Sequence, residues 1–244
     1  MEISFILPTY NEVGNLEKLF YEILNNIRQI SSNFEVIFID DGSDDGSTEL
    51  IKKLYHAHPS CIKYIIFTKN YGKSAALDAG FKLASGEIVF TLDSDGQDDP
   101  KEIPKFIAKI NEGYDLVSGW KQNRQDSFIK NSTSKIYNWV TNTIFGLNLH
   151  DQNCGFKAYK KAVVKKLSLF SDLHRFIPVL VVNLGYKVTE VKIEHRKRTS
   201  GQSKFGIKRF FMGFWDLLVV LSLITFKNKP LTPKNFYQIK YTQS

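Results

Sequence analysis

Asp93 and Asp95 stand one residue apart at the end of the apolar run 88–92, and their spacing points directly to chemistry. A run that short, with β-branched residues, predicts a strand buried on both faces, as in a parallel sheet. Ligands of open α/β sheets bind at the carboxyl ends of such strands. Two neighbouring carboxylates repel each other, and a hard divalent cation shared with substrate phosphates is the usual remedy. The alternative is a solvated acidic turn in which an Asp caps the next helix.

Strands and helices alternate through the first half of the chain. Apolar runs predict strands at 3–8, 34–39, 62–68, 88–92 and 114–118. Between them the sequence predicts a helix capped by Asn15, a helix capped by Ser47, an Ala-rich helix to Ala84 and a helix from Pro100 to Gly113. This alternation predicts βαβ units with right-handed connections and therefore an α/β fold with a mostly parallel sheet flanked by helices.

Length and composition fit one globular domain. The 244 residues are 43% hydrophobic and 24% charged, which is ordinary for a protein with a full core. The net charge of +8 is uneven: residues 195–244 hold ten Lys or Arg and one acid, so they carry +9 and residues 1–194 carry −1. Such a basic segment points to phosphates or an anionic membrane surface as its partner. The two cysteines, Cys61 and Cys154, show neither metal spacing nor a disulfide framework, which suits a reducing environment.

Residues 205–226 combine aromatic bulk with basic residues, which predicts an amphipathic helix lying in the membrane interface. The 17-residue apolar run 210–226 is interrupted by Asp216 and is shorter than the roughly 20 apolar residues that a spanning helix needs. The N-terminus leads directly into a strand, with no signal segment before it. We therefore expect peripheral membrane attachment. A helix packed on the sheet or at a dimer interface is the alternative.

Seven short motifs occur in an order that resembles a known enzyme family. They are Pro8-Thr9-Tyr10-Asn11-Glu12, Asp40-Asp41-Gly42-Ser43, Asp93-Ser94-Asp95-Gly96-Gln97, Ser118-Gly119-Trp120-Lys121, Asn153-Cys154-Gly155-Phe156-Lys157, His174-Arg175-Phe176-Ile177-Pro178 and Arg198-x-x-Gly-x-Ser203-Lys204. The first three resemble family 2 glycosyltransferases of the GT-A fold, which is Rossmann-like. The other four resemble the branch that glycosylates polyprenyl phosphates, including dolichol-phosphate mannosyltransferases and bacterial undecaprenyl-phosphate relatives.

The resemblance covers roughly residues 1–226 and has two departures. Gly96 stands where many relatives have Leu, which is expected to loosen that turn without removing a ligand. Many relatives continue into transmembrane helices, whereas this sequence continues as a polar, basic tail over 227–244. The predicted organisation is a catalytic domain at 1–204, an interfacial helix at 205–226 and that tail.

The resemblance implies a site for each part of the donor. Mg²⁺ or Mn²⁺ would be held against the diphosphate by Asp93, Asp95 and Gln97, an oxygen-only set that suits a hard cation. The nucleoside would be bound by Pro8, Tyr10, Glu12, Asp40 and Asp41. For Asp40 and Asp41 the alternative is a turn that caps the next helix. Asp98 and Asp99 are interpreted as first-turn acids of the helix that follows.

The acceptor phosphate would be bound by cations and a hydroxyl. The candidates are Lys121, Arg124, Arg175, Arg198, Ser203 and Lys204. A phosphate monoester is largely ionised at neutral pH, since its second pKa lies near ~6, so its oxygen can attack the anomeric carbon without a general base. Asp151 is then a weak candidate base that orients the acceptor or a sugar hydroxyl instead. Arg196 and Lys197 are interpreted as a solvated basic loop, His150 as a loop residue, and Cys154 as chemically inert.

The sequence thus predicts metal-dependent, inverting transfer of a hexose from a UDP- or GDP-sugar to a polyprenyl phosphate. The enzyme would work in cell-envelope glycan biosynthesis, peripherally on the cytosolic face of the membrane. Homo-oligomers are compatible with the sequence. Transfer to a soluble saccharide is one alternative, and a nucleotide-binding protein without transfer activity is another. No nucleic-acid partner is expected, because the sequence has no stacking platform, helix-turn-helix or zinc finger.

Overall fold

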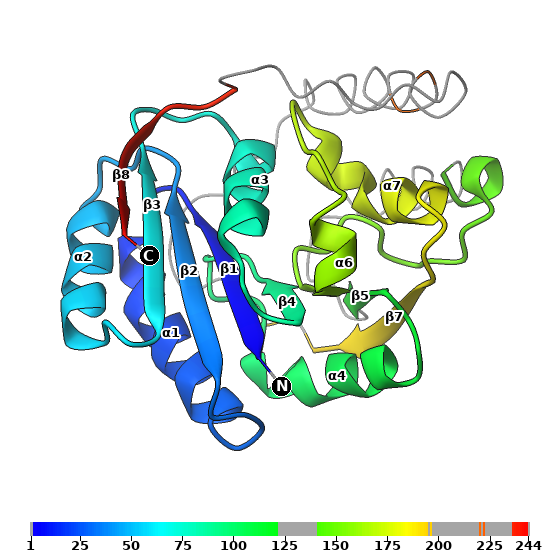
Figure 1. The fold of residues 1–244 in the computed structure, drawn as a ribbon, viewed down its shortest axis with the longest axis horizontal. Coiled ribbons are helices and arrows are strands. Elements are labelled where there is room, and N and C mark those ends of the chain that lie inside the picture. Colours follow the sequence, from blue (N-terminus) through cyan, green and yellow to red (C-terminus); the bar gives the residue numbers. More distant parts are fainter. Residues whose placement is uncertain are drawn as a thin grey trace.

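The computed structural model describes residues 2–121, 141–194, 196, 220, 222 and 236–243. In that part of the chain an eight-stranded sheet, in the order β7-β5-β6-β4-β1-β2-β3-β8, carries helices on both faces (Figure 1). The strands are β1 (Ile3–Thr9), β2 (Phe34–Asp40), β3 (Ile62–Phe67), β4 (Ile88–Thr91), β5 (Leu116–Lys121), β6 (Lys157–Lys160), β7 (Val188–Ile193) and β8 (Ile239–Gln243). The helices are α1 (Val13–Ile27), α2 (Ser47–Ala57), α3 (Lys73–Leu83), α4 (Ile103–Asn111), α6 (Lys161–Val164) and α7 (Ile177–Asn183), with 3-10 turns η1 (Pro100–Glu102) and η2 (Leu173–Phe176). The predicted α/β fold with a mostly parallel sheet is confirmed.

Two hydrophobic clusters hold the helices to the sheet. Alternate residues of a strand point to opposite faces, so Phe5 and Leu7 of β1 belong to the cluster under α1, α2 and α4. Ile6, between them, belongs to the cluster under α3, α6 and α7. Residues on both sides of β1 and β4 are fully buried, which explains why these strands read as continuous apolar runs. The buried strands therefore fix where their carboxyl ends, and the polar loops that follow, must lie.

Two strands run antiparallel to the rest of this mostly parallel sheet, and neither of them is among the strands predicted from the sequence. β6 lies antiparallel between β4 and β5, and β8 lies antiparallel along β3. The position of β6 matters for the site, because it brings Lys157 directly opposite Thr91 at the carboxyl end of β4. The predicted strand at 114–118 is instead β5, which begins at Leu116 and extends to Lys121.

Both predicted helix caps are wrong by a few residues. Asn15 lies buried inside α1, where its amide nitrogen donates to Glu12 Oε2 over 2.7 Å, and Glu12 precedes the helix. Ser47 is the first residue of α2, after Gly46; its N–H donates to Asp45 Oδ1 over 2.9 Å. At α2 a side chain before the helix thus takes the capping contact predicted for Ser47, whereas the Glu12 side chain caps no backbone N–H of α1.

The C-terminal residues return to the sheet. The Tyr237 ring stacks on Phe67 at 4.8 Å between ring centroids, and its hydroxyl donates to Asp78 over 3.2 Å. β8 then follows along the edge of β3. The predicted catalytic domain, 1–204, does not include β8. This strand of the sheet lies instead in the predicted tail, 227–244. Among the described residues no helix is long and apolar enough to cross a membrane; most of 205–226 lies outside them.

Candidate active site

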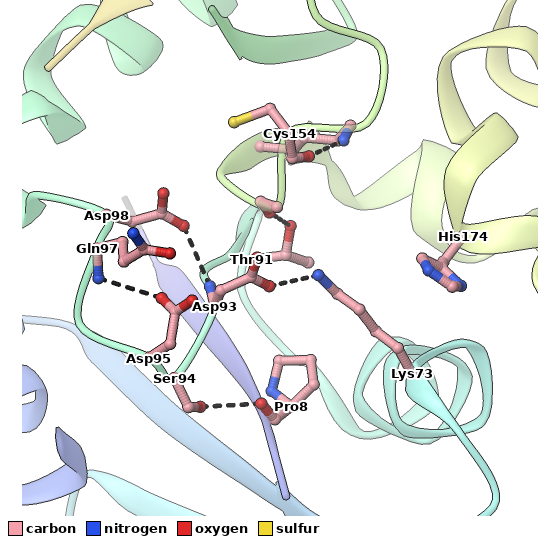
Figure 2. A network of polar contacts seen from close by, with 12 residues as sticks. Pro8, Lys73, Thr91, Asp93, Ser94, Asp95, Gln97, Asp98, Cys154 and His174 are labelled. Atoms are coloured by element: carbon pink, nitrogen blue, oxygen red, sulfur yellow. Dashed lines mark hydrogen bonds and ion pairs between the residues drawn. The ribbon is translucent and has the colours of Figure 1, made fainter. Parts of the chain in front are cut away.

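Asp93 follows the carboxyl end of β4, and its carboxylate lies near the ammonium groups of Lys73, Lys121 and Lys157. Its carboxylate forms an ion pair with Lys73 at the start of α3 (Figure 2). Burial disfavours the charged form, but Lys73 and Lys121 outweigh it and hold the pKa of Asp93 well below the usual range. Gly155 passes across this carboxylate so closely that a Cβ there would lie 2.3 Å from Asp93 Oδ2. Glycine at that position therefore lets the chain close over an ionised Asp93.

Asp95 lies two residues further on, in the turn 93–97. Ser94 fixes the base of this turn, because its hydroxyl donates to the carbonyl of Pro8 over 2.9 Å. The Asp95 carboxylate accepts the N–H of Gln97 over 3.1 Å. Burial, then the charges of Asp93 and Asp98, raise the pKa of Asp95 to about 6. Gly96 has a φ of 72°, which glycine adopts without strain, so this residue suits the turn.

Asp98 is wrongly interpreted as a first-turn helix acid. It is fully buried and accepts the N–H of Asp93 over 3.2 Å. Lys121, at the end of β5, lies 2.9 Å from its other oxygen. Burial opposes the charge of Lys121, but Asp98 outweighs it and raises the pKa of Lys121 above its usual range. Asp99 does behave as predicted, since its carboxylate accepts the N–H of Lys101 over 3.0 Å at the start of η1.

The donor atoms of this turn fit a hard divalent cation. Asp93, Asp95 and Gln97 would offer oxygen ligands, and burial, then the charges of Asp93 and Asp98, raise the pKa of Asp95. Within the described ranges, no three His, Cys, Asp or Glu side chains converge closely enough to hold a metal by themselves. A cation here would therefore need further oxygen atoms, such as those of a diphosphate.

The predicted nucleoside residues follow β1 and β2 at the same edge of the sheet. Asp40 accepts the N–H of Ser43 over 3.0 Å and the hydroxyl of Thr48. Asp41 accepts the N–H groups of Tyr71 and Gly72, over 2.6 and 2.9 Å. Both acids thus hold loops in place. Asp40 does so within its own turn, as the alternative of a helix-capping turn predicts, whereas Asp41 binds the loop before α3. Pro8, the half-buried Tyr10 and Glu12 lie at the end of β1 and in the loop that follows it.

The predicted acceptor residues are only partly described. Lys121 is buried against Asp98, and Arg175 in η2 is mostly buried, with Asp172 3.5 Å away. Asp151 is 3% exposed, and its carbonyl accepts the hydroxyl of Ser118 over 3.3 Å. His150 stacks on Trp120 and contacts Glu190. Arg124, Arg198, Ser203 and Lys204 lie outside the described residues.

Three further residues of the site had no assigned role in the sequence analysis. Lys73, Lys157 and His174 line one pocket beside Asp93, together with Cys154. Lys157 and His174 belong to motifs quoted above. The signal that could have pointed to Lys157 is its position as a charged residue between Phe156 and the apolar pair Ala158-Tyr159. Burial raises the pKa of the Cys154 thiol to about 12, which agrees with its interpretation as inert.

Arg196 is wrongly interpreted as part of a solvated loop. Its guanidinium group lies 2.7 Å from Asp99 Oδ1 and 2.7 Å from Glu22 Oε2. Its backbone N–H donates to the carbonyl of Gln97 over 3.0 Å, and its carbonyl accepts the side-chain amide of Gln97 over 3.3 Å. Arg196 therefore ties the acidic turn, η1 and α1 to the chain that leads into Arg198.

Comparisons with known proteins agree with this fold. The family model described as glycosyl transferase family 2 matches residues 4–168. The chain is 34% identical over 220 residues to an undecaprenyl-phosphate 4-deoxy-4-formamido-L-arabinose transferase of Aeromonas hydrophila, covering 90% of this chain and 68% of that protein.

Two solved structures share the architecture at low identity. Mannosyl-3-phosphoglycerate synthase from Rubrobacter xylanophilus superimposes with a TM-score of 0.71 at 13% identity, covering 96% of this chain and 77% of that one. Glucosyl-3-phosphoglycerate synthase from Mycobacterium tuberculosis, in complex with Mn²⁺ and UDP-glucose, gives 0.65 at 16% identity, covering 91% and 78%.

An acidic turn at the carboxyl edge of this mostly parallel sheet, in a fold shared with these synthases, defines a GT-A glycosyltransferase. The chain belongs to glycosyl transferase family 2, and the resemblance seen in its motifs is confirmed at that level.

Proposed function

We propose that this enzyme transfers a hexose from a nucleotide sugar to a polyprenyl phosphate, with inversion at the anomeric carbon. The observation that carries the proposal is the extent of the similarity to an undecaprenyl-phosphate sugar transferase. It covers 90% of the chain, whereas the family model ends at residue 168. The similarity therefore includes residues beyond the family domain, where the predicted acceptor-binding residues Arg175, Arg198 and Lys204 lie.

The acidic turn supports the donor half of the proposal. Asp93, Asp95 and Gln97 would hold Mg²⁺ or Mn²⁺, and the ion would neutralise the nucleoside diphosphate as it leaves. Lys73 would then exchange its ion pair with Asp93 for a substrate oxygen. Pro8, Tyr10, Glu12, Asp40 and Asp41 would line the nucleoside, because the loops after β1 and β2 end at the same edge of the sheet. The synthase from Mycobacterium tuberculosis, which shares this fold, is in complex with Mn²⁺ and UDP-glucose, and this supports a metal and a nucleotide sugar as ligands here.

The acceptor half needs cations more than it needs a base. The phosphate oxygen of the lipid would attack the anomeric carbon directly, since that phosphate is already ionised at neutral pH. Arg124, Arg175, Arg198, Ser203 and Lys204 would hold it. The buried Asp151 would orient rather than deprotonate, because a phosphate dianion has no proton to lose.

A lipid acceptor places the enzyme at a membrane surface. The segment 205–226 would lie in the interface of the cytosolic leaflet, where its lysines and arginines meet anionic headgroups. Homo-oligomers are compatible with this arrangement.

The test is a screen of labelled UDP- and GDP-sugars against a polyprenyl phosphate and against soluble saccharides, with Mg²⁺, with Mn²⁺ and with excess chelator. We expect label in the lipid phase for one donor, only when a metal is present. Label on a soluble saccharide alone would replace the lipid acceptor. Nucleotide binding without transfer to any acceptor would contradict the proposal.

A further inference from the structure

The loop 147–156, which leads into β6, carries Asp151 to the side of the acidic turn. Further along this loop, Gly155 passes directly across Asp93. Burial lowers the pKa of Lys157, the first residue of β6, and the charges of Asp151 and Asp93 oppose that shift. The buried carboxylate of Asp151 therefore lies close enough to the candidate active site for its charge to act there. Its position depends on what holds the loop.

Glu190 of β7 holds the loop directly before Asp151. One oxygen of the Glu190 carboxylate accepts the backbone N–H of His150 over 2.7 Å, and the other contacts Nδ1 of the His150 ring. The Glu190 side chain is 12% exposed, whereas that of His150 is 54% exposed. A hydrogen bond to a carboxylate is stronger than one between neutral groups. Glu190 thus fixes both the backbone and the ring of the residue that precedes Asp151.

The neighbouring strand β5 supports the same part of the loop. Ser118 lies opposite Glu190 in the parallel pair of strands, and Trp120 lies two residues further along the same face of the sheet. The Trp120 ring stacks on His150 with 3.8 Å between ring centroids and 9° between their planes. The hydroxyl of Ser118 donates to the carbonyl of Asp151 over 3.3 Å. Two strands therefore hold residues 150 and 151.

Asn142 holds the loop on either side of these two residues. Its side-chain amide nitrogen donates to the carbonyl of Leu149 over 2.8 Å, and its oxygen accepts the N–H of Leu149 over 3.3 Å. The same oxygen accepts the side-chain amide of Gln152 over 2.8 Å. Four consecutive residues, 149–152, are thus tied to other parts of the fold. This number of contacts is typical of a loop that keeps a buried carboxylate in one place.

We infer that Glu190 is a positioning residue for sugar transfer, which acts through His150 to keep Asp151 in place. The inference rests on the proposed function, in which Asp151 orients the acceptor or a sugar hydroxyl. Without the Glu190 carboxylate, the N–H and the ring of His150 lose these contacts and the loop can shift. A displacement of about 1 Å in a group that orients a substrate can lower the rate about 100-fold. The loss belongs to the transfer step, because the nucleoside residues lie on the loops after β1 and β2.

The first test compares Glu190→Ala and Glu190→Gln with Glu17→Ala, in which an exposed glutamate of α1 undergoes the same truncation. Glu190→Ala should lower kcat about 10- to 100-fold, and calorimetry should find its affinity for UDP or GDP within about twofold of the wild type. Glu190→Gln should regain most of the lost kcat, since its amide oxygen can still accept the N–H of His150. Glu17→Ala should behave as the wild type does.

A double-mutant cycle with Asp151→Asn distinguishes positioning from general stabilisation. If Glu190 acts through Asp151, Glu190→Ala should lower kcat less than about twofold when Asp151 is already replaced. A residue that only stabilises the fold would lower the melting temperature and leave kcat unchanged. Equal losses of kcat in the two backgrounds, or full kcat in Glu190→Ala, would overturn the inference.

A second variant keeps the test valid if Glu190→Ala fails to fold. His150→Ala removes the ring that Glu190 contacts and leaves the backbone N–H in place. The His150 side chain is more than half exposed, so its removal threatens the fold less. Its loss of kcat should be several-fold, and this loss should likewise disappear in the Asp151→Asn background. An equal loss in both backgrounds would overturn the inference.

The cycle is measured with the acceptor that the screen selects, so the two proposals fail separately. Transfer to a soluble saccharide would contradict the proposed function, and the cycle would still decide the role of Glu190. Transfer to a polyprenyl phosphate with equal losses in both backgrounds would leave the function and remove the positioning role. A wild type without turnover on any acceptor would overturn both.

Discussion

Asp95 is the residue on which donor binding depends in this account, and its surroundings explain why. Asp93 is neutralised by Lys73 and Asp98 by Lys121. Burial, then the charges of these two acids, raise the pKa of Asp95 to about 6. Its charge is thus unfavourable until a cation joins the turn, which makes Asp95 the most sensitive point for substitution.

Asp95→Asn should lower the rate of transfer by at least about 100-fold, because an amide lacks the charge that holds a divalent cation. The fold should persist, and the melting temperature would verify this. Glu112→Gln, a charge removal on an exposed residue beyond α4, is the matched control and should keep full activity. Substantial turnover by Asp95→Asn, or by the wild type in excess chelator, would contradict the metal site.

The same carboxyl should make stability depend on pH when no metal is present. A carboxyl whose pKa is higher in the folded protein than in the unfolded chain destabilises the fold as pH rises. The loss begins near the unfolded value of 3.8 and is complete above about 6, where it approaches about 3 kcal/mol.

Urea unfolding in chelator, from pH 4 to 8, would measure this effect. Asp95→Asn should be more stable than the wild type by an amount that grows from pH 4 to 6 and then stays constant. Added Mn²⁺ should reduce the difference by stabilising the wild type. A difference that does not vary with pH would show that Asp95 is not perturbed.

At the scale of elements, Arg196 links the donor turn to the chain that leads into Arg198. Its planar guanidinium group contacts Asp99 through two nitrogens and Glu22 through a third. Lysine could keep the charge but not this geometry. Arg196 thus anchors the chain two residues before Arg198, the first residue of the predicted acceptor motif.

Arg196→Ala should lower the free energy of unfolding by about 2 kcal/mol. If residues 198–204 bind the acceptor, it should also raise KM for the lipid phosphate several-fold and leave nucleotide affinity unchanged. Arg196→Lys should restore little of the lost stability or of the affinity for the lipid phosphate. Lys101→Ala, an exposed lysine in η1, is the control, and steady-state kinetics with urea unfolding are the measurements. Equal loss of nucleotide affinity would mean that Arg196 supports the donor turn alone.

Local patterns in the sequence predict the elements well and their long-range partners poorly. The apolar runs that precede Asp40 and Asp93 form strands that are buried on both faces. The continuous apolar sequence of each run is enough to predict this. β6, by contrast, has only four residues, and it becomes a strand through pairing with β4 and β5. The partners of Asp98 and Arg196 come from 23 and 97 residues away along the chain, distances over which spacing carries no signal.

For the molecule as a whole, the return of the C-terminus to β3 changes how membrane attachment should be tested. Removing everything after Lys204 would also remove β8 and the Tyr237–Phe67 stack, so lost activity would have two causes. Substitutions inside 205–226 avoid this difficulty. Lys208→Glu with Arg209→Glu removes the basic charge, and Trp215→Ala removes apolar bulk.

The full-length protein should sediment with vesicles that contain anionic lipid. Each Lys or Arg near the surface contributes about 1 kcal/mol, which salt screens, while apolar burial is not screened. High salt should therefore release only part of the protein. The charge-reversed pair should lose the salt-sensitive part and Trp215→Ala the remainder. Failure of the wild type to sediment at low salt would mean that the segment packs on protein, and a soluble acceptor would become the stronger proposal.

The proposed function requires that a lipid phosphate attacks the sugar, and ³¹P NMR of the reaction would show whether it does. Enzyme, Mg²⁺, the donor selected by the screen and a short-chain prenyl phosphate would be followed in one tube. We predict that the phosphate monoester signal is replaced by that of a glycosyl phosphodiester, as nucleoside diphosphate appears in equal amount. The anomeric proton coupling of the product should show the configuration opposite to that of the donor. A monoester signal that persists while nucleoside diphosphate accumulates would contradict the claim, because the sugar would then have passed to water or to a hydroxyl group.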